Sequence, residues 1–175
     1  MACFFRSTAP RRKYPWGAAI IFFCLQATTA HSEPVTLLFA GDLMLADGPG
    51  RTIAAGGDPL APFAAILNQA DYRIGNLEVP VATSGKPHAS KIVSFRADPR
   101  VVSALHGRFD AVSLANNHSG DYEHDAFVET MRHLSNAGIA YFGGGHNLAE
   151  AHRPIWIEKN GLKIAVLGYN EFKPR

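Results

Sequence analysis

Short strand-like segments alternating with helical segments constrain the fold of this chain more than any other feature. The apolar runs expected to form strands cover residues 35–40, 71–75, 92–95, 109–115 and 139–142. Runs of this length bounded by turn residues are typical of buried β-strands. A further pair, 155–158 and 162–167, flanks Asn160-Gly161, which is the strongest short signal for a β-hairpin.

Three segments between the strands carry helix signals. Asp58-Pro59 and Asp98-Pro99 each combine an N-cap residue with proline at the first helical position. Helical spacing then extends to about residue 70 in the first case and through Leu105 in the second. A third helix is predicted before Gly138, on the apolar positions Phe127, Met131 and Leu134. Alternation of strands and helices predicts an α/β layered fold.

Polar side chains follow three of the predicted strands at the point where each ends. Asp42 follows the first strand, Asn76 and Glu78 follow the second, and residues 116–118 (Asn-Asn-His) follow the segment at 109–115. In open α/β sheets, ligands bind outside the carboxyl ends of the strands. This edge of the sheet is therefore the predicted place for chemistry.

These side chains suit a divalent cation. Asp42, Glu78, Asn117 and His118 offer carboxylate oxygens, an amide oxygen and an imidazole, which bind Mn, Fe, Zn, Mg or Ca. Such a cation activates a water molecule or polarises a phosphoryl or acyl oxygen. His118 is also a candidate general acid, because imidazole titrates near neutral pH.

Each motif also has a simpler interpretation. Asp42 after Gly41 is compatible with a turn, and the segment 76–78 with a polar strand end. The asparagines at 116 and 117 are common residues at helix N-caps. A glycosidase that uses Glu78 and Asp42 as its two carboxylates is open on residue type alone. No G-x-S-x-G motif is present to supply a serine nucleophile.

Two further motifs have local explanations. The glycines at 143–145 resemble the start of a dinucleotide fingerprint, but Leu148 occupies the position of its last glycine, so a tight loop with positive φ angles is favoured. Asp121 and Asp125 are expected to cap the following helix. Asp121 is also near enough in sequence to orient His118.

The first thirty residues have the order of a secretory signal peptide. A basic start is followed by an apolar stretch at 16–25 and by small residues at 28–30. The alternative is an uncleaved N-terminal anchor that attaches the chain to the membrane. Either reading predicts export, to the periplasm, the extracellular space or the membrane surface of the cell envelope, and leaves one domain at 31–175.

The charge of that domain argues against nucleic acid as a partner. Residues 1–30 hold four of the 17 Lys and Arg and none of the 15 Asp and Glu. The remaining chain has 13 basic against 15 acidic residues, a formal charge of −2, and no basic footprint for nucleic acid. Both cysteines, Cys3 and Cys24, also lie in the first thirty residues, so no disulfide is expected in the domain.

Several motifs in series resemble the capsule synthesis protein CapA family, which is associated with poly-gamma-glutamate synthesis. They are Phe-Ala-Gly-Asp-Leu-Met-Leu at 39–45, Gly-Asn-Leu-Glu-Val-Pro at 75–80, Ala-Asn-Asn-His-Ser at 115–119 and Gly-Gly-Gly-His-Asn-Leu-Ala-Glu-Ala at 143–151. That family belongs to the calcineurin-like metallophosphatase superfamily. The resemblance extends from about residue 35 to the end of the sequence.

The resemblance implies a metallophosphatase-like layered sandwich (αββα) and a metal site. It implies Asp42, Glu78 and Asn117 as ligands of Mn, Fe or Zn, and His118 as the residue that contacts or protonates the reacting group. Asn76, Asn116 and Asp121 are expected to support them.

The resemblance also implies a role in making, exporting or anchoring an anionic poly-glutamate polymer, with the polymer or its synthesis machinery as partner. Hydrolysis of a phosphoester or amide is suggested by the superfamily. Family members are longer and carry further histidines, so the expectation is a fold truncated after its first half, with an unpaired sheet face or edge. Enzyme activity would then need a C-terminal half, and the alternatives are a non-catalytic envelope component or an inactive fragment.

Overall fold

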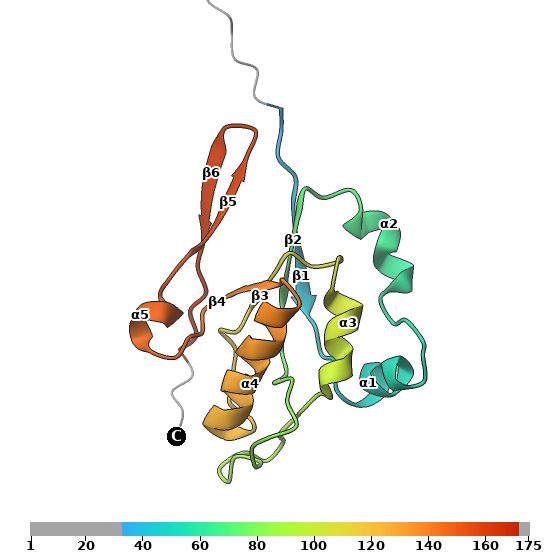
Figure 1. Ribbon diagram of the computed structural model, residues 1–175, viewed down its shortest axis with the longest axis vertical. Coiled ribbons are helices and arrows are strands. Elements are labelled where there is room, and N and C mark those ends of the chain that lie inside the picture. The colour runs from blue at the N-terminus through green and yellow to red at the C-terminus, as the bar shows by residue number, and fades with distance from the viewer. Residues whose placement is uncertain (1–32, 172–175) are drawn as a thin grey trace, which may run out of the picture. The chain divides into compact units, whose positions relative to one another are not determined.

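The computed structural model describes residues 33–171, and the predicted signal peptide or anchor at 1–30 lies outside this range. The strands are β1 (Leu37–Asp42), β2 (Tyr72–Asn76), β3 (Ala111–Ser113), β4 (Ala140–Phe142), β5 (Ile155–Lys159) and β6 (Leu162–Val166). The helices are α1 (Asp47–Ala54), α2 (Ala64–Leu67), α3 (Val102–Leu105), α4 (Glu123–Asn136) and α5 (Leu148–Ala151), with 3₁₀ turns η1 (Ala61–Phe63) and η2 (Pro99–Val101) (Figure 1). Within the described range, no helix has the length and hydropathy needed to cross a membrane.

Strands β1 to β4 form one parallel sheet in the order in which they occur along the chain. Asp42 pairs with Asn76, Asn76 with Ser113, and Ser113 with Phe142. These residues are the last of their strands, so all four carboxyl ends meet at one edge of the sheet. The predicted α/β fold is confirmed, and so is the predicted hairpin, whose strands β5 and β6 are antiparallel.

The two faces of the sheet pack against different elements. On one face, Val112 of β3 shares a core with Leu105 of α3 and with Met131 and Leu134 of α4. The other face packs against the hairpin; its core residues are Ile74, Ala111, Phe142 and Ile157. The alternation of side chains along β3, with Ala111 on one side and Val112 on the other, separates the two cores.

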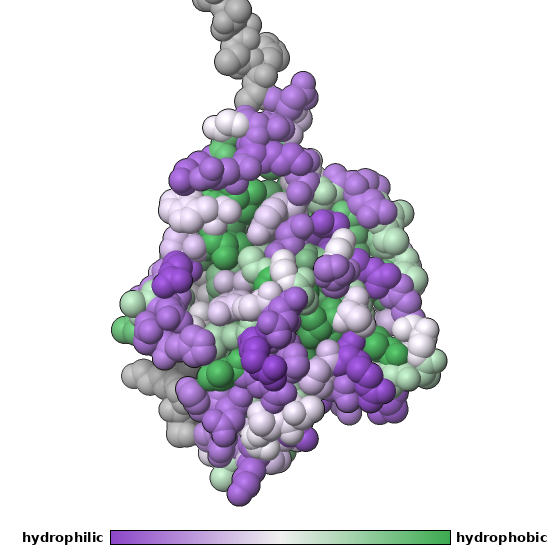
Figure 2. Space-filling model, viewed as in Figure 1, coloured by the Kyte–Doolittle hydropathy of each residue, from purple (hydrophilic) through white to green (hydrophobic). Residues whose placement is uncertain are grey.

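Part of the hairpin-side face carries exposed apolar side chains. Phe39 of β1 is 64% exposed and borders an open groove of about 320 Å³ that also includes Ser113, Gly168 and Tyr169. Hydrophobic areas also lie between hydrophilic ones on the surface seen in Figure 2. In the part of the chain that the structure describes, the other large exposed hydrophobic residues are Phe63, Ile66, Ile92, Val93, Leu148, Trp156, Leu162, Leu167 and Tyr169.

Two local predictions are wrong, and one helix was not predicted. Residues 92–95 form no strand; they belong to a long connection in which Ile92 and Val93 are exposed. The helix expected to reach residue 70 is divided into η1 and α2 and ends at Leu67. Helix α1 was not predicted, because its sequence Asp-Gly-Pro-Gly contains the residues that usually interrupt helices.

The connection at 83–98 is attached to α4 through Glu129. The Glu129 carboxylate accepts hydrogen bonds from the backbone N–H groups of Thr83 (3.1 Å) and Ser84 (2.9 Å) and from Ser84 Oγ (2.5 Å). Gly85 has a φ of +83°, and a β-carbon there would overlap the carbonyl oxygen of Tyr122. The start of the connection is therefore fixed against the beginning and middle of α4.

Opposing effects act on the pKa of Glu129. Desolvation by burial raises it, whereas hydrogen bonds from Ser84, His133 and Thr83 lower it, and the net result is a pKa well below its usual range. Since the folded-state pKa lies below the unfolded one, Glu129 contributes stability above the unfolded pKa. That contribution is lost as the pH falls toward the folded pKa.

Thr130, a buried residue of α4, provides a test of how the segment after β2 is held. Its Oγ1 accepts a hydrogen bond from the backbone N–H of Val81 (2.8 Å). Thr130→Val keeps the shape but leaves this buried N–H without its partner, so the free energy of unfolding should fall by about 1–3 kcal/mol. Urea unfolding measures this change, and the exposed Ser135→Ala on the same helix should cost far less. Equal effects for the two variants would contradict the assignment.

Glu129→Gln tests the attachment of the connection at 83–98. The variant should unfold more easily than the wild type near neutral pH, and the difference should shrink as the pH falls below about 4. Urea unfolding over a pH series gives both quantities. Glu123→Gln, an exposed change in the first turn of the same helix, should show no such pH-dependent difference. A Glu129→Gln effect of constant size across the series would refute the mechanism.

Candidate functional site

Asp42 and Glu78 meet on one side-chain amide at the ends of β1 and β2. Asn76 Nδ2 donates to Asp42 Oδ1 at 2.8 Å and also to Glu78 Oε2. The parallel register places Asp42 beside Asn76, and Glu78 follows two residues later. Asp42 is exposed and Glu78 is half-buried. The sheet therefore brings two of the predicted metal ligands to a single point.

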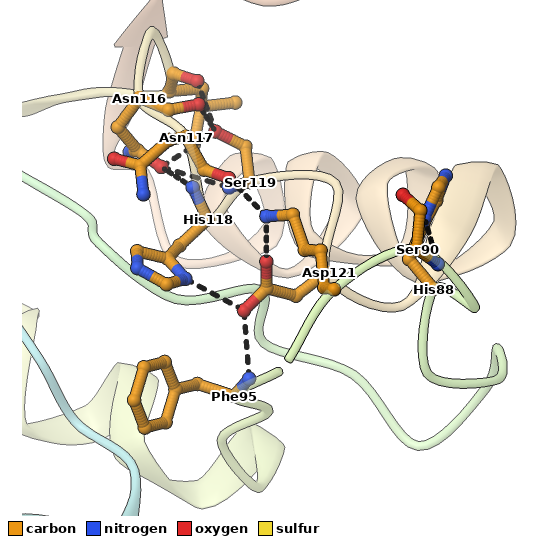
Figure 3. Close-up of polar contacts among 10 residues, drawn as sticks. His88, Ser90, Phe95, Asn116, Asn117, His118, Ser119 and Asp121 are labelled. Carbon is orange, nitrogen blue, oxygen red and sulfur yellow. Dashed lines mark hydrogen bonds and ion pairs between the residues drawn. The ribbon is translucent and has the colours of Figure 1, made fainter. Parts of the chain in front are cut away.

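Asn116 joins this pair of carboxylates to the end of β3. Its Nδ2 donates to Asn76 Oδ1 (3.0 Å) and to the carbonyl oxygen of Leu77 (2.9 Å). Its Oδ1 accepts from the backbone N–H groups of His118 (2.9 Å) and Ser119 (2.8 Å), as the dashed lines in Figure 3 show. One amide thus shapes the turn after β3 and links it to β2. The predicted supporting role of Asn116 has this structural basis.

His118 pairs with Asp121 at the same turn. His118 Nδ1 lies 2.8 Å from Asp121 Oδ2 (Figure 3). The Asp121 side chain has no solvent exposure. Asp121 and His118, which are near each other in sequence, are thus in direct contact, and the orienting role of Asp121 stays a prediction. The prediction that Asp121 caps α4 is wrong, because its oxygens are used by His118, Phe95 N–H (2.7 Å) and Lys91 Nζ, and Tyr122 occupies the N-cap position without a side-chain bond.

Asn117 contributes its backbone rather than its side chain to the contacts seen here. Its carbonyl oxygen accepts a hydrogen bond from Lys91 Nζ. Within residues 33–171, its side-chain amide has no hydrogen-bond partner. An amide oxygen in this state is free to bind a cation, but it is not linked to Asp42 or Glu78.

The side chains at this edge of the sheet are of the kind that bind a divalent cation, but few of them are clustered. Asp42 and Glu78 supply anionic oxygens that converge on the same amide group, which is the arrangement that a cation favours. No group of three or more His, Cys, Asp or Glu side chains in the described part of the chain is arranged to hold a metal ion. A cation at this edge would therefore depend on amide oxygens or other ligands besides the two carboxylates.

Two residues of the site escaped the sequence analysis. Lys91 forms an ion pair with Asp121, and the Phe95 ring lies against the His118 imidazole with centroids 5.1 Å apart. Both belong to the connection at 83–98, in which residues 92–95 were expected to form a strand. No periodic pattern identifies a residue whose partner lies some thirty positions away, so no sequence signal was available for Lys91.

The glycine-rich loop after β4 lies close to the site. Gly143 has a φ of +71°, and a β-carbon there would be 2.6 Å from Cβ of Ala115. Glycine is thus required both for the backbone conformation and for the close approach of the loop to the residue before Asn116. The predicted tight loop with a positive φ angle is confirmed at this position.

The comparisons with known proteins concern most of the chain. The family model described as bacterial capsule synthesis protein PGA_cap matches residues 36–175. The capsule biosynthesis protein CapA of Bacillus anthracis is 27% identical in an alignment of 149 residues that covers 80% of this chain and 36% of that protein. The PGA biosynthesis protein CapA of Bacillus subtilis (strain 168) is also 27% identical, in an alignment of 148 residues that covers 82% of this chain and 39% of that protein.

A third relative, the uncharacterized protein y4sH of Sinorhizobium fredii, is 28% identical over 75% of this chain and 29% of its own length. This chain therefore spans less than two fifths of the length of each of these three relatives. The matched region contains β1 to β6 and every residue of the candidate site. The chain belongs to the bacterial capsule synthesis protein family PGA_cap.

Proposed function

We propose that this protein acts in the biosynthesis of a poly-gamma-glutamate capsule and carries a metal-dependent, hydrolase-type site at the carboxyl ends of β1, β2 and β3. Membership of the PGA_cap family and the two CapA relatives support the biological role. The convergence of Asp42 and Glu78 on Asn76 is the observation that carries the proposed site.

Asp42 and Glu78 would hold the cation, with the side-chain oxygen of Asn117 as a further ligand. A bound Mn, Fe or Zn ion supplies Lewis-acid polarisation of a phosphoryl or acyl oxygen and activates water. Asn76 keeps the two carboxylates together through its Nδ2 group. Asn116 fixes Asn76 through its own amide.

His118 is the proposed proton-transfer residue. Its Nδ1 atom is engaged by Asp121, so Nε2 is the ring atom left for a reacting group. The His118 side chain is one-fifth exposed, which permits contact with a substrate, whereas the Asp121 side chain has no solvent exposure. A histidine held by a buried carboxylate has a fixed orientation for proton transfer.

The exposed face of the sheet supports the layered sandwich as part of this proposal. Phe39 lies on the hairpin side of β1, where the β5–β6 hairpin leaves it 64% exposed. A second sheet packed over this face would bury Phe39 and produce the αββα arrangement. The proposed place of action is the cell envelope, through the signal peptide or anchor at 1–30, with the anionic polymer or its synthesis machinery as partner.

The alternative function is that of a non-catalytic envelope component. The hydrogen bonds of Asn76 favour it, since one uncharged amide joins both carboxylates and Asn116. Such a cluster is able to hold the ends of β1, β2 and β3 together without a cation. Metal binding and turnover separate the two functions.

Metal binding is the first test. Elemental analysis of the purified protein and titration calorimetry with Mn, Fe(II) and Zn should detect a site, and Asp42→Asn or Glu78→Gln should weaken it roughly tenfold or more. Glu158→Gln, an exposed change on β5, is the matched control and should leave the affinity unchanged. Absence of binding in the wild type would favour the non-catalytic function.

Hydrolysis is the second test. His118→Gln should lower metal-dependent turnover of a phosphoester or a γ-glutamyl amide by about 10²- to 10⁴-fold, because a general acid–base is lost. Metal affinity should change little, since His118 is not among the proposed ligands. Turnover that is unaffected by His118→Gln would contradict its role, and metal-dependent turnover by the wild type would exclude the non-catalytic alternative.

A further inference from the structure

We propose that Lys91 is a positioning residue of this site: it holds the Asp121 carboxylate so that His118 keeps a proton on Nδ1 and presents Nε2 as its free ring atom. The use of Nε2 in proton transfer rests on the proposed function. The arrangement of the three side chains does not.

Asp121 is buried and therefore depends on its polar partners. Its side chain has no solvent exposure, and a buried carboxylate needs a charged or hydrogen-bonded partner for each oxygen. Lys91 Nζ binds Oδ1, while Phe95 N–H (2.7 Å) and His118 Nδ1 (2.8 Å) share Oδ2. Lys91 is thus the partner that satisfies one oxygen and leaves the other to the histidine.

Lys91 is attached at two points, which fixes the carboxylate relative to the histidine. Its Nζ donates to Asp121 Oδ1 and also to the carbonyl oxygen of Asn117, the residue before His118. The same ammonium group therefore joins the carboxylate to the backbone that carries the imidazole. Without it, Oδ1 would lose its charged partner and the carboxylate would be free to rotate away from His118.

The consequence for the imidazole follows from the direction of these bonds. Lys91 Nζ and Phe95 N–H are donors only, so they keep Asp121 an acceptor, and His118 Nδ1 must then supply a proton. In a neutral ring the lone pair is consequently on Nε2. The Phe95 ring, tilted by 59° against the imidazole, restricts rotation of the ring away from this position.

A purely structural role of the Lys91–Asp121 ion pair predicts a different result. If Lys91 only stabilised the fold, its loss would lower the free energy of unfolding and leave the tautomer of His118 unchanged. The tautomer is therefore the quantity that distinguishes a positioning residue from a structural one.

Long-range ¹H–¹⁵N correlation spectra of the full chain, recorded at mildly alkaline pH, report the tautomer, and the His118 signals are assigned by their loss in His118→Gln. The wild type should show mainly the Nδ1–H form. In Lys91→Met, the Asp121 carboxylate is no longer held against Nδ1, so the ratio of Nδ1–H to Nε2–H should fall roughly tenfold as the Nδ1–H···carboxylate bond is lost. Lys91→Arg, which keeps the charge, should restore most of the ratio.

The control is Lys86→Met, an exposed lysine of the same connection, which should leave the spectrum unchanged. If Lys91→Met does not fold, Lys91→Gln replaces it, because the amide keeps a neutral donor near Asp121; the ratio should fall in the same direction by a smaller factor. A wild-type His118 in the Nε2–H form, or an unchanged ratio in a folded Lys91→Met or Lys91→Gln, would overturn the proposal. These spectra need neither bound metal nor turnover, so a failure of the proposed function leaves their outcome intact.

Discussion

A carboxylate with no access to water sets the arrangement of the site. Asp121 is fully buried, and its two oxygens accept from three donors: Lys91 and Phe95 of the connection at 83–98, and His118 of its own turn. Because an unpaired buried charge is strongly destabilising, the connection at 83–98 has to remain folded against the turn after β3. The hydrogen bonds of Glu129 also hold the start of that connection in place.

Uncharged amides organise the other half of the site. Asn76 and Asn116 each use both polar atoms of the side chain, and together they link the ends of β1, β2 and β3. An amide both donates and accepts, so it is able to hold two carboxylates close while binding a neighbouring amide. The site is thus divided into an acidic half at Asp42 and Glu78 and a histidine half at His118.

Several features with a local signal could be predicted from the sequence. The apolar run before Asp42, the Asn160-Gly161 turn and the Asp98-Pro99 cap all depend on residues close in sequence, and each is found in the structure. The segment at 92–95 resembled a strand, but within residues 33–171 no strand pairs with it. Lys91 was missed for the related reason that its role depends on Asp121, a contact which only the folded chain creates. The motif residues were identified early, while their mutual contacts required the structure.

The order of strands in the sheet has a consequence for how the protein is made. Each of β2, β3 and β4 pairs with the strand that precedes it in the chain, so the sheet is able to grow in the direction of synthesis without waiting for later segments. Asp42 and Asn76 can meet as soon as β2 is available. Lys91 and Phe95, by contrast, emerge before Asp121 exists to receive them. The histidine half of the site is therefore completed after the acidic half, because Lys91 and Phe95 reach their partner only once the turn after β3 has been synthesised.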